Sequence, residues 1–203
     1  MKTWQSLSRR MLAILLSAAM LALAAANTAQ AADDFWAHQI GVQVNVAYGE
    51  DPAQVFDLYL HGQRTGEPDY FAMDSDPRPT LIWIHGGGWI AGDKAAEIPQ
   101  LIPYLERGWN VVNVNYRQGL ASAPEAVDDV LCAYQRVIEI GEATGMPTDQ
   151  IVVSGASAGG HLALLVGMLN TRGEHPCRTA SPPMAVVNSV SYTHLTLPTT
   201  VFV

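Results

Sequence analysis

The sequence is short of charged residues, which make up 15% of its 203 positions against about 25% in typical proteins. Basic residues are the scarcer kind, with 11 Lys and Arg against 19 Asp and Glu and a formal net charge of −8. This balance argues against a nucleic-acid-binding protein, which needs a basic face. The hydrophobic content of 49% excludes a disordered chain.

Cysteine occurs only twice, at Cys132 and Cys177. Two cysteines form neither the framework of a disulfide-rich mini-protein nor a cysteine-rich zinc cluster. Whether the two pair stays open on the sequence, because an exported protein permits a disulfide but the spacing reveals no geometry. We expect no cofactor and no metal.

The one long apolar run without a charge, residues 11–26, lies close to the N-terminus. Lys2, Arg9 and Arg10 precede it, and a small-x-small cleavage site follows at residues 29–31. The run is shorter than the roughly 20 residues that a membrane span needs. Residues 1–31 are therefore expected to be a signal peptide, which predicts a periplasmic or secreted protein without membrane attachment after cleavage.

The C-terminal residues 189–203 continue no helical or strand pattern. Residues 190–199 match the translation of one reading frame of a common transposase sequencing adapter. We therefore expect residues 189–203 to be a non-native tail, the alternative being a native C-terminus that matches by chance. Residues 32–188 are then expected to be the N-terminal part of a longer domain.

Between these ends, strand and helix patterns alternate. Residues 41–48 and 55–60 alternate polar and apolar side chains and could pair as a hairpin, while residues 61–79 have the composition of a loop. Beyond residue 79, strands and helices are expected to alternate along the chain. This order predicts an α/β fold with a mostly parallel, doubly wound sheet and the antiparallel hairpin at one edge. The expected buried strands are 81–84, 111–114, 151–153 and one that begins at 184; the expected helices are 95–107, 124–142 and 157–169.

The strongest chemical motif is Gly155-Ala156-Ser157-Ala158-Gly159, between an expected strand and an expected helix. In that context a G-x-S-x-G pattern is typical of a serine nucleophile held on a sharp turn. The residues two before and two after the serine then lie close together, so both must lack a side chain. The helix N-terminus at Ser157 favours developing negative charge.

A second glycine-rich segment, His85-Gly86-Gly87-Gly88, follows the first expected buried strand. Its glycines allow the backbone to approach a ligand closely and to direct N–H groups into a site, as in the oxyanion-hole loops of lipases and esterases. A phosphate-binding loop is the alternative, but no Gly-Lys-Ser/Thr follows. Together the two motifs predict acyl transfer at a serine.

With these motifs the chain resembles an α/β-hydrolase of the HGGG-type carboxylesterase group, close to its hormone-sensitive-lipase-like and bacterial feruloyl- and acetyl-esterase-like branches. The resemblance implies hydrolysis of small-molecule esters by a serine assisted by a His and an Asp or Glu. It assigns Ser157 as the nucleophile and the backbone N–H groups of Gly86, Gly87 and Ala158 as the oxyanion hole. The segments that carry it are 47–49, 57–60, 85–89, 115–117, 129–130 and 155–163.

The remaining triad residues depart from the family pattern. In α/β-hydrolases the acidic residue and then the histidine follow the serine in the chain, on strands beyond the one expected to begin at residue 184. The only acidic residue after Ser157 is Glu174. We therefore expect the triad Asp or Glu and His to be absent from this chain, which would then be nearly inactive.

We assign none of the available histidines as the general base. His161 lies on the serine's own helix and is expected to point back along it, and His175 is expected in a solvated loop. His194 falls in the expected tail, and His85 is expected to brace the glycine-rich loop rather than to transfer protons.

Four other residues have expected structural roles. Arg117 and Asp129 match positions of the resembled family and are expected to form a buried pair. Asp93 and Lys94 are expected at a solvated loop end.

Two other functions remain open. Formamidase or peptidase activity on the same fold is the nearest enzymatic alternative, and a non-catalytic relic or binding module is the alternative from another class. An incomplete parallel sheet with an exposed hydrophobic edge argues against the relic, because such edges promote aggregation. For the same reason we expect the chain as written to be poorly soluble. The sequence leaves the oligomeric state open.

Overall fold

The computed structural model describes residues 39–64, 71–73, 77–170, 172 and 175–189. Apart from Gln39, these residues fall within one compact unit, Ile40–Val203. The expected signal peptide, most of the expected tail, Glu174 and His194 lie outside the described residues. None of the helices in the described part combines the length and apolar character that a membrane span requires.

The described strands form one mixed sheet in the order β1-β2-β5-β4-β6-β7, with β3 paired to β2. Strand β2 runs antiparallel to β3 and β5, whereas β5, β4, β6 and β7 are parallel. This arrangement confirms the α/β fold class, with the N-terminal hairpin at one edge. The strands are β1 (Gln39–Ala47), β2 (Val55–Arg64), β3 (Phe71–Met73), β4 (Thr80–Ile84), β5 (Asn110–Val114), β6 (Ile151–Gly155) and β7 (Ala185–Asn188).

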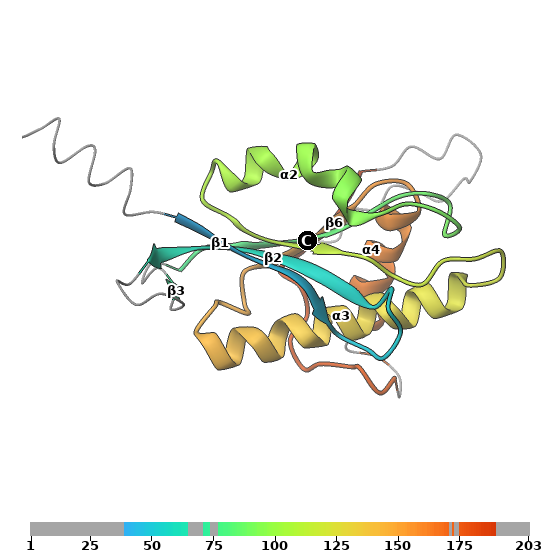
Figure 1. Ribbon diagram of the computed structural model, residues 1–203. Coiled ribbons are helices and arrows are strands. Elements are labelled where there is room, and N and C mark those ends of the chain that lie inside the picture. Colours follow the sequence, from blue (N-terminus) through green and yellow to red (C-terminus); the bar gives the residue numbers. More distant parts are fainter. Residues whose placement is uncertain (1–38, 65–70, 74–76, 171, 173–174, 190–203) are drawn as a thin grey trace, which may run out of the picture. The chain divides into compact units, whose positions relative to one another are not determined.

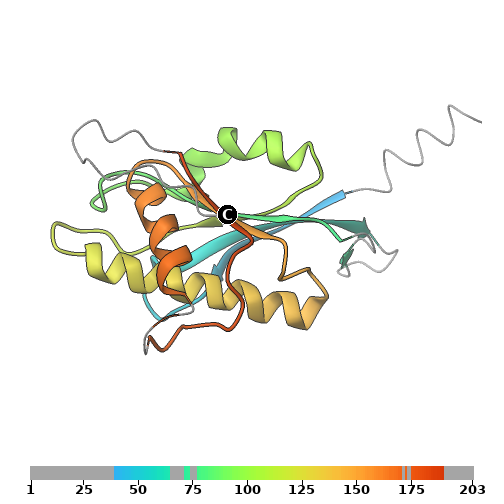
Figure 2. The same cartoon turned by 180° about the vertical axis from the view of Figure 1, so that it is seen from behind.

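Helices cover both faces of this sheet (Figures 1 and 2). The 3-10 turn η1 (Lys94–Glu97) and helix α2 (Ile98–Leu105) lie on one face, and α3 (Ala123–Thr144) and α4 (Ala158–Leu169) lie on the other. Because side chains alternate along a strand, β4 contributes to both cores. Its Leu81 and Trp83 pack with α2, and its Ile82 and Ile84 pack with α3 and α4.

The three central strands β4, β5 and β6 are buried at every position, as their continuous apolar runs predicted. Helix α3 begins with a proline in its first turn, and Gly145, which has φ +82°, caps its C-terminal end. A left-handed backbone conformation just after the last turn favours glycine, because glycine has no Cβ. This helix agrees with the expected span within two residues at either end.

Three expectations about secondary structure and strand burial were wrong. Residues 61–79 are not all loop, because β2 continues to Arg64 and pairs with β3 from Gly62↔Met73 to Arg64↔Phe71. Backbone pairing of this kind needs no apolar pattern, so composition did not reveal it. The expected helix 95–107 is split into η1 and α2. Strand β7 is only half-buried, with Val187 49% exposed, because it is the last strand in the described order.

The open question of the two cysteines is settled by the structure. Cys132 on α3 and Cys177, in the segment between α4 and β7, form a disulfide with their Cα atoms 4.8 Å apart. The cross-link therefore joins the segment that follows α4 to the long helix α3.

Candidate active site

Ser157 sits on a sharp turn between β6 and α4, with φ +52° and ψ −119°. A non-glycine residue in this region of backbone space carries strain of about 1–3 kcal/mol and persists only where its surroundings enforce it. The turn places Ser157 at the N-cap of α4, with its side chain half-buried. The serine thus lies at the helix end where free N–H groups concentrate positive charge.

The two flanking glycines are required by close backbone approaches. A Cβ on Gly155 would lie 2.6 Å from the carbonyl carbon of Gly159, and a Cβ on Gly159 would overlap the carbonyl oxygens of Ile84 and His85. The expectation that both positions must lack side chains is confirmed. The end of β4, the turn after β6 and the first turn of α4 are therefore packed backbone against backbone.

This packing predicts that Gly159→Ala lowers the unfolding free energy by about 3 kcal/mol, the upper end of what overpacking typically costs. In a helix without such contacts, replacing glycine by alanine raises the unfolding free energy. A decrease on Gly159→Ala would therefore indicate the steric clash. Gly119→Ala is the matched control, because its Cβ would meet Ser122 at ordinary distances of 3.6 and 3.7 Å. Urea unfolding followed by circular dichroism measures both, and equal midpoints for the two variants would contradict the close approach.

The glycine-rich loop after β4 passes directly beside the serine. A Cβ on Gly86 would lie 3.2 Å from the Cβ of Ser157 and 2.9 Å from the carbonyl oxygen of Ala156. Gly87 has φ +119°, which favours glycine. The backbone N–H groups of Gly86, Gly87 and Ala158 donate none of the hydrogen bonds between described residues. The fold therefore brings together all four residues that the sequence assigned to catalysis.

His85 supports this loop through a ring stack and two hydrogen bonds. Its fully buried ring stacks on Tyr116 at 4.3 Å between centroids, and its Nδ1–H donates to the Gly86 carbonyl oxygen at 2.7 Å. The Tyr116 hydroxyl donates to the carbonyl oxygen of His85 at 3.1 Å. Burial lowers the pKa of His85 below its usual 6.5, which keeps the ring neutral at neutral pH. The expectation that His85 braces the loop agrees with these contacts.

The far end of the loop is held by a buried ion pair, and the expectation of a solvated Lys94 was wrong. Lys94 is only 8% exposed, its Nζ lies 2.9 Å from Oδ1 of the buried Asp57, and it donates to Asn45 Oδ1 at 2.9 Å. These bonds connect the start of η1 to β1 and β2. Lys94 is the only lysine besides Lys2, and that scarcity is the one sequence signal that could have singled it out.

Gln118 is a further loop contact that sequence reasoning missed. Its amide donates to the Gly92 carbonyl oxygen at 2.9 Å, and the same amide nitrogen lies 3.4 Å from His85 Nε2. Ser122 Oγ donates to the carbonyl oxygen of Trp89 at 3.2 Å. Contacts between residues this far apart in the chain leave no trace in local patterns.

His161 packs one turn along α4 and does not reach the serine hydroxyl through any hydrogen bond between described residues. Its ring meets Trp89 edge-on at 5.5 Å between centroids, and burial lowers its pKa. More generally, no described histidine or carboxylate hydrogen-bonds to the hydroxyl of Ser157. The site as described therefore contains a candidate nucleophile and candidate oxyanion donors, without a described proton acceptor.

The expected pairing of Arg117 with Asp129 is confirmed, but only Asp129 is buried, because the Arg117 side chain is 35% exposed. The guanidinium contacts the carboxylate through Nε at 3.0 Å and Nη2 at 2.6 Å, and the fully buried carboxylate also accepts from the Arg117 backbone N–H at 2.8 Å. Gln54 Nε2 donates a further bond at 2.7 Å. The pair thus ties the loop after β5 to α3 and to the β1–β2 turn.

Comparison with known proteins identifies similar chains. The sequence model of the BD-FAE family matches residues 70–195. Esterase LipC of Mycobacterium tuberculosis is 31% identical over 125 residues, which are 61% of this chain and 29% of LipC. Lipase 2 of Moraxella sp. is 38% identical over 95 residues, 45% of this chain and 22% of that lipase.

Solved structures agree with the sequence matches. Esterase B from Lactobacillus rhamnosis has a TM-score of 0.60 and 26% identity, covering 83% of this chain and 57% of that one. A bacterial heroin esterase has a TM-score of 0.51 and 26% identity, covering 69% of this chain and 42% of that one. The chain thus spans less than a third of the length of these two curated relatives and just over half of esterase B.

Proposed function

The chain belongs to the BD-FAE family of α/β-hydrolases, among relatives that are esterases and lipases, and on this premise we propose that it carries the nucleophile and oxyanion hole of a serine carboxylesterase. The observation that carries the proposal is the strained Ser157, at φ +52°, directly beside the backbone of Gly86. A strained serine between a buried strand and a helix is the geometry that a nucleophile elbow requires.

In the proposed reaction, Ser157 Oγ attacks the carbonyl carbon of a small ester while a base removes the hydroxyl proton. The negative charge that develops on the carbonyl oxygen is stabilised by the N–H groups of Gly86, Gly87 and Ala158. Collapse of the intermediate breaks the bond to the alcohol, which leaves with a proton, and water then hydrolyses the acyl-serine ester. Loss of one oxyanion donor typically costs about 10²–10³ in rate.

The base and its carboxylate partner are proposed to follow residue 188 in the complete protein. The chain order in this fold is serine, then Asp or Glu, then histidine. Both the coverage of the relatives and the absence of a described acceptor at Ser157 support this proposal.

We further propose that residues 1–31 export the protein to the periplasm or the medium. The disulfide between Cys132 and Cys177 supports export, because such bonds persist in oxidising compartments and are rare in the cytosol.

These proposals predict that residues 32–203 alone hydrolyse p-nitrophenyl acetate no faster than their Ser157→Ala variant, since no base takes the serine proton. A long read of the gene beyond the codon for Asn188 is expected to continue in frame and to encode an Asp or Glu and then a His. The product of that complete frame should turn over the ester.

Two results would count against the proposals. Brisk turnover by residues 32–203 that disappears in Ser157→Ala would refute the missing base while leaving the nucleophile in place. A reading frame that closes directly after Val203 would instead favour a relic or binding module.

A further inference from the structure

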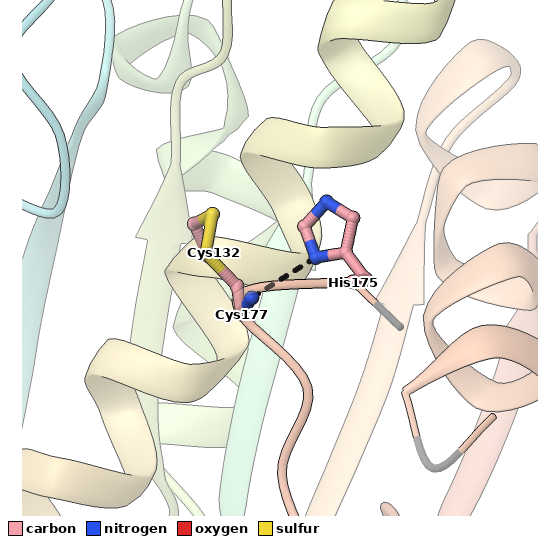
Figure 3. Close-up of side chains that lie close together, drawn as sticks. All are labelled: Cys132, His175 and Cys177. Carbon is pink, nitrogen blue, oxygen red and sulfur yellow. Dashed lines mark hydrogen bonds between the residues drawn. A yellow bond between two sulfur atoms is a disulfide. The ribbon is translucent and has the colours of Figure 1, made fainter. Parts of the chain in front are cut away.

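Cys132, His175 and Cys177 form a compact cluster that the proposed ester chemistry does not use (Figure 3). Cys132 projects from α3, while His175 and Cys177 come from the segment between α4 and β7. Their two sulfur atoms and one ring nitrogen all lie within 4.8 Å of one another, and all three residues are half-buried. Thiolate and imidazole are the ligands that Zn²⁺ and similar cations prefer.

The expectation that His175 is solvated was wrong, because its side chain is only 21% exposed and both ring nitrogens are hydrogen-bonded. Its Nδ1 accepts the backbone N–H of Cys177 at 3.1 Å, so Nδ1 carries a lone pair on that side (Figure 3). Its Nε2 lies 3.1 Å from Oδ1 of Asp128, which accepts the remaining N–H. Asp128 lies one turn before Cys132 on α3.

The hydrogen bond between Asp128 and His175 resembles the one that supports metal-binding histidines. A histidine that ligates a metal through one nitrogen usually donates its other N–H to a carboxylate, which sets the tautomer and the orientation of the ring. Asp128 and His175 already have this arrangement, with Nδ1 facing the backbone N–H of Cys177. The imidazole is thus oriented before any cation binds.

We propose that, when the disulfide is reduced, Cys132, Cys177 and His175 bind one Zn²⁺-like cation. A dithiol reductant delivers two electrons and two protons to the disulfide and becomes a disulfide itself, which leaves two thiols. The cation then displaces both thiol protons and bonds to the two thiolates and to Nδ1, with water in the fourth position. The Cys177 N–H gives up its bond to Nδ1 in this step.

The distances suit such a cation. Zn–S bonds of about 2.3 Å and Zn–N bonds of about 2.0 Å place tetrahedral ligand atoms roughly 3.5–3.8 Å apart. The sulfur atoms must therefore separate from their bonded distance, while the cluster as a whole already lies within 4.8 Å. Disulfide and cation exclude each other, so the segment after α4 would be tied to α3 either by a covalent bond or by a metal ion.

The test uses the full chain, reduced under nitrogen and freed of reductant, with Zn²⁺ and Co²⁺ as the probes. The reduced protein should take about one equivalent of Zn²⁺ from a chromophoric chelator, and Co²⁺ should give a thiolate-to-metal charge-transfer band. The oxidised protein should give neither. The Cys132→Ser/Cys177→Ser variant should lose the band.

Asp128→Asn keeps all three ligands and both cysteines, so it tests the oriented ring without removing the disulfide. Its affinity for Zn²⁺ should fall about tenfold. Loss of a group that hydrogen-bonds a metal ligand typically costs about 10–100-fold in affinity, and the lower end is expected because Asp128 is exposed. Glu142→Gln on the same helix is the matched control and should bind as the wild type does.

Three results would overturn the proposal. One is equal uptake by the oxidised protein, and another is no uptake by the reduced protein. The third is an affinity that Asp128→Asn leaves unchanged, which is also the result expected if reduction unfolds the chain and exposes the cysteines as independent thiols.

Discussion

Ser157→Ala is expected to lower kcat for the proposed ester hydrolysis by the complete protein by about 10⁶-fold, the loss typical when a serine nucleophile is removed from its triad. In the proposed reaction the hydroxyl oxygen of Ser157 forms the acyl-enzyme, and no other described side chain lies at the turn to replace it. The proposed oxyanion donors Gly86, Gly87 and Ala158 remain in the variant, so a residual rate above that in water is expected.

Ser154→Ala is the matched control for this experiment. Ser154 lies three residues earlier on β6, and its buried hydroxyl donates to the Val187 carbonyl oxygen at 2.8 Å, so its loss should cost about 1 kcal/mol of stability. Its effect on kcat should be small. Initial rates with p-nitrophenyl acetate distinguish the two variants, and equal rates for Ser157→Ala and wild type would refute the nucleophile assignment.

The second large effect concerns the disulfide. Cys132→Ser is expected to lower the unfolding free energy of the oxidised protein by about 4 kcal/mol, because a cross-link across 45 residues strongly restricts the unfolded chain. The enclosed segment contains β6, Ser157 and α4. The cross-link therefore closes a loop that contains the turn at Ser157.

Comparing the two single variants with the double variant separates the effect of the cross-link from that of side-chain packing. Cys177→Ser should cost the same as Cys132→Ser, and the double variant should add almost nothing, since either change alone opens the loop. Urea unfolding under non-reducing conditions measures all three. A double variant that loses about twice as much as either single variant would show that packing, rather than the cross-link, dominates.

The elements that the sequence predicted correctly are those whose signal is local. The apolar runs of β4, β5 and β6 are long enough to identify strands buried on both faces. The spacing around Ser157 predicted the turn because Gly155 and Gly159 meet a steric demand that only glycine satisfies. The errors lie where pairing depends on backbone alone, as in β3, or on neighbouring strands, as in the half-exposed β7.

By itself, then, the sequence determined the α/β class, the strained serine and the glycine-rich loop, since periodicity and steric exclusion act over a few residues. Only the tertiary structure decided which side chains from distant parts of the chain come into contact. It paired Lys94 with Asp57, joined Cys132 to Cys177, and set His175 between Asp128 and the cysteines. These partners are separated by 37 to 47 residues, except for the neighbouring His175 and Cys177, so their contacts arise only when the sheet and its helices have packed.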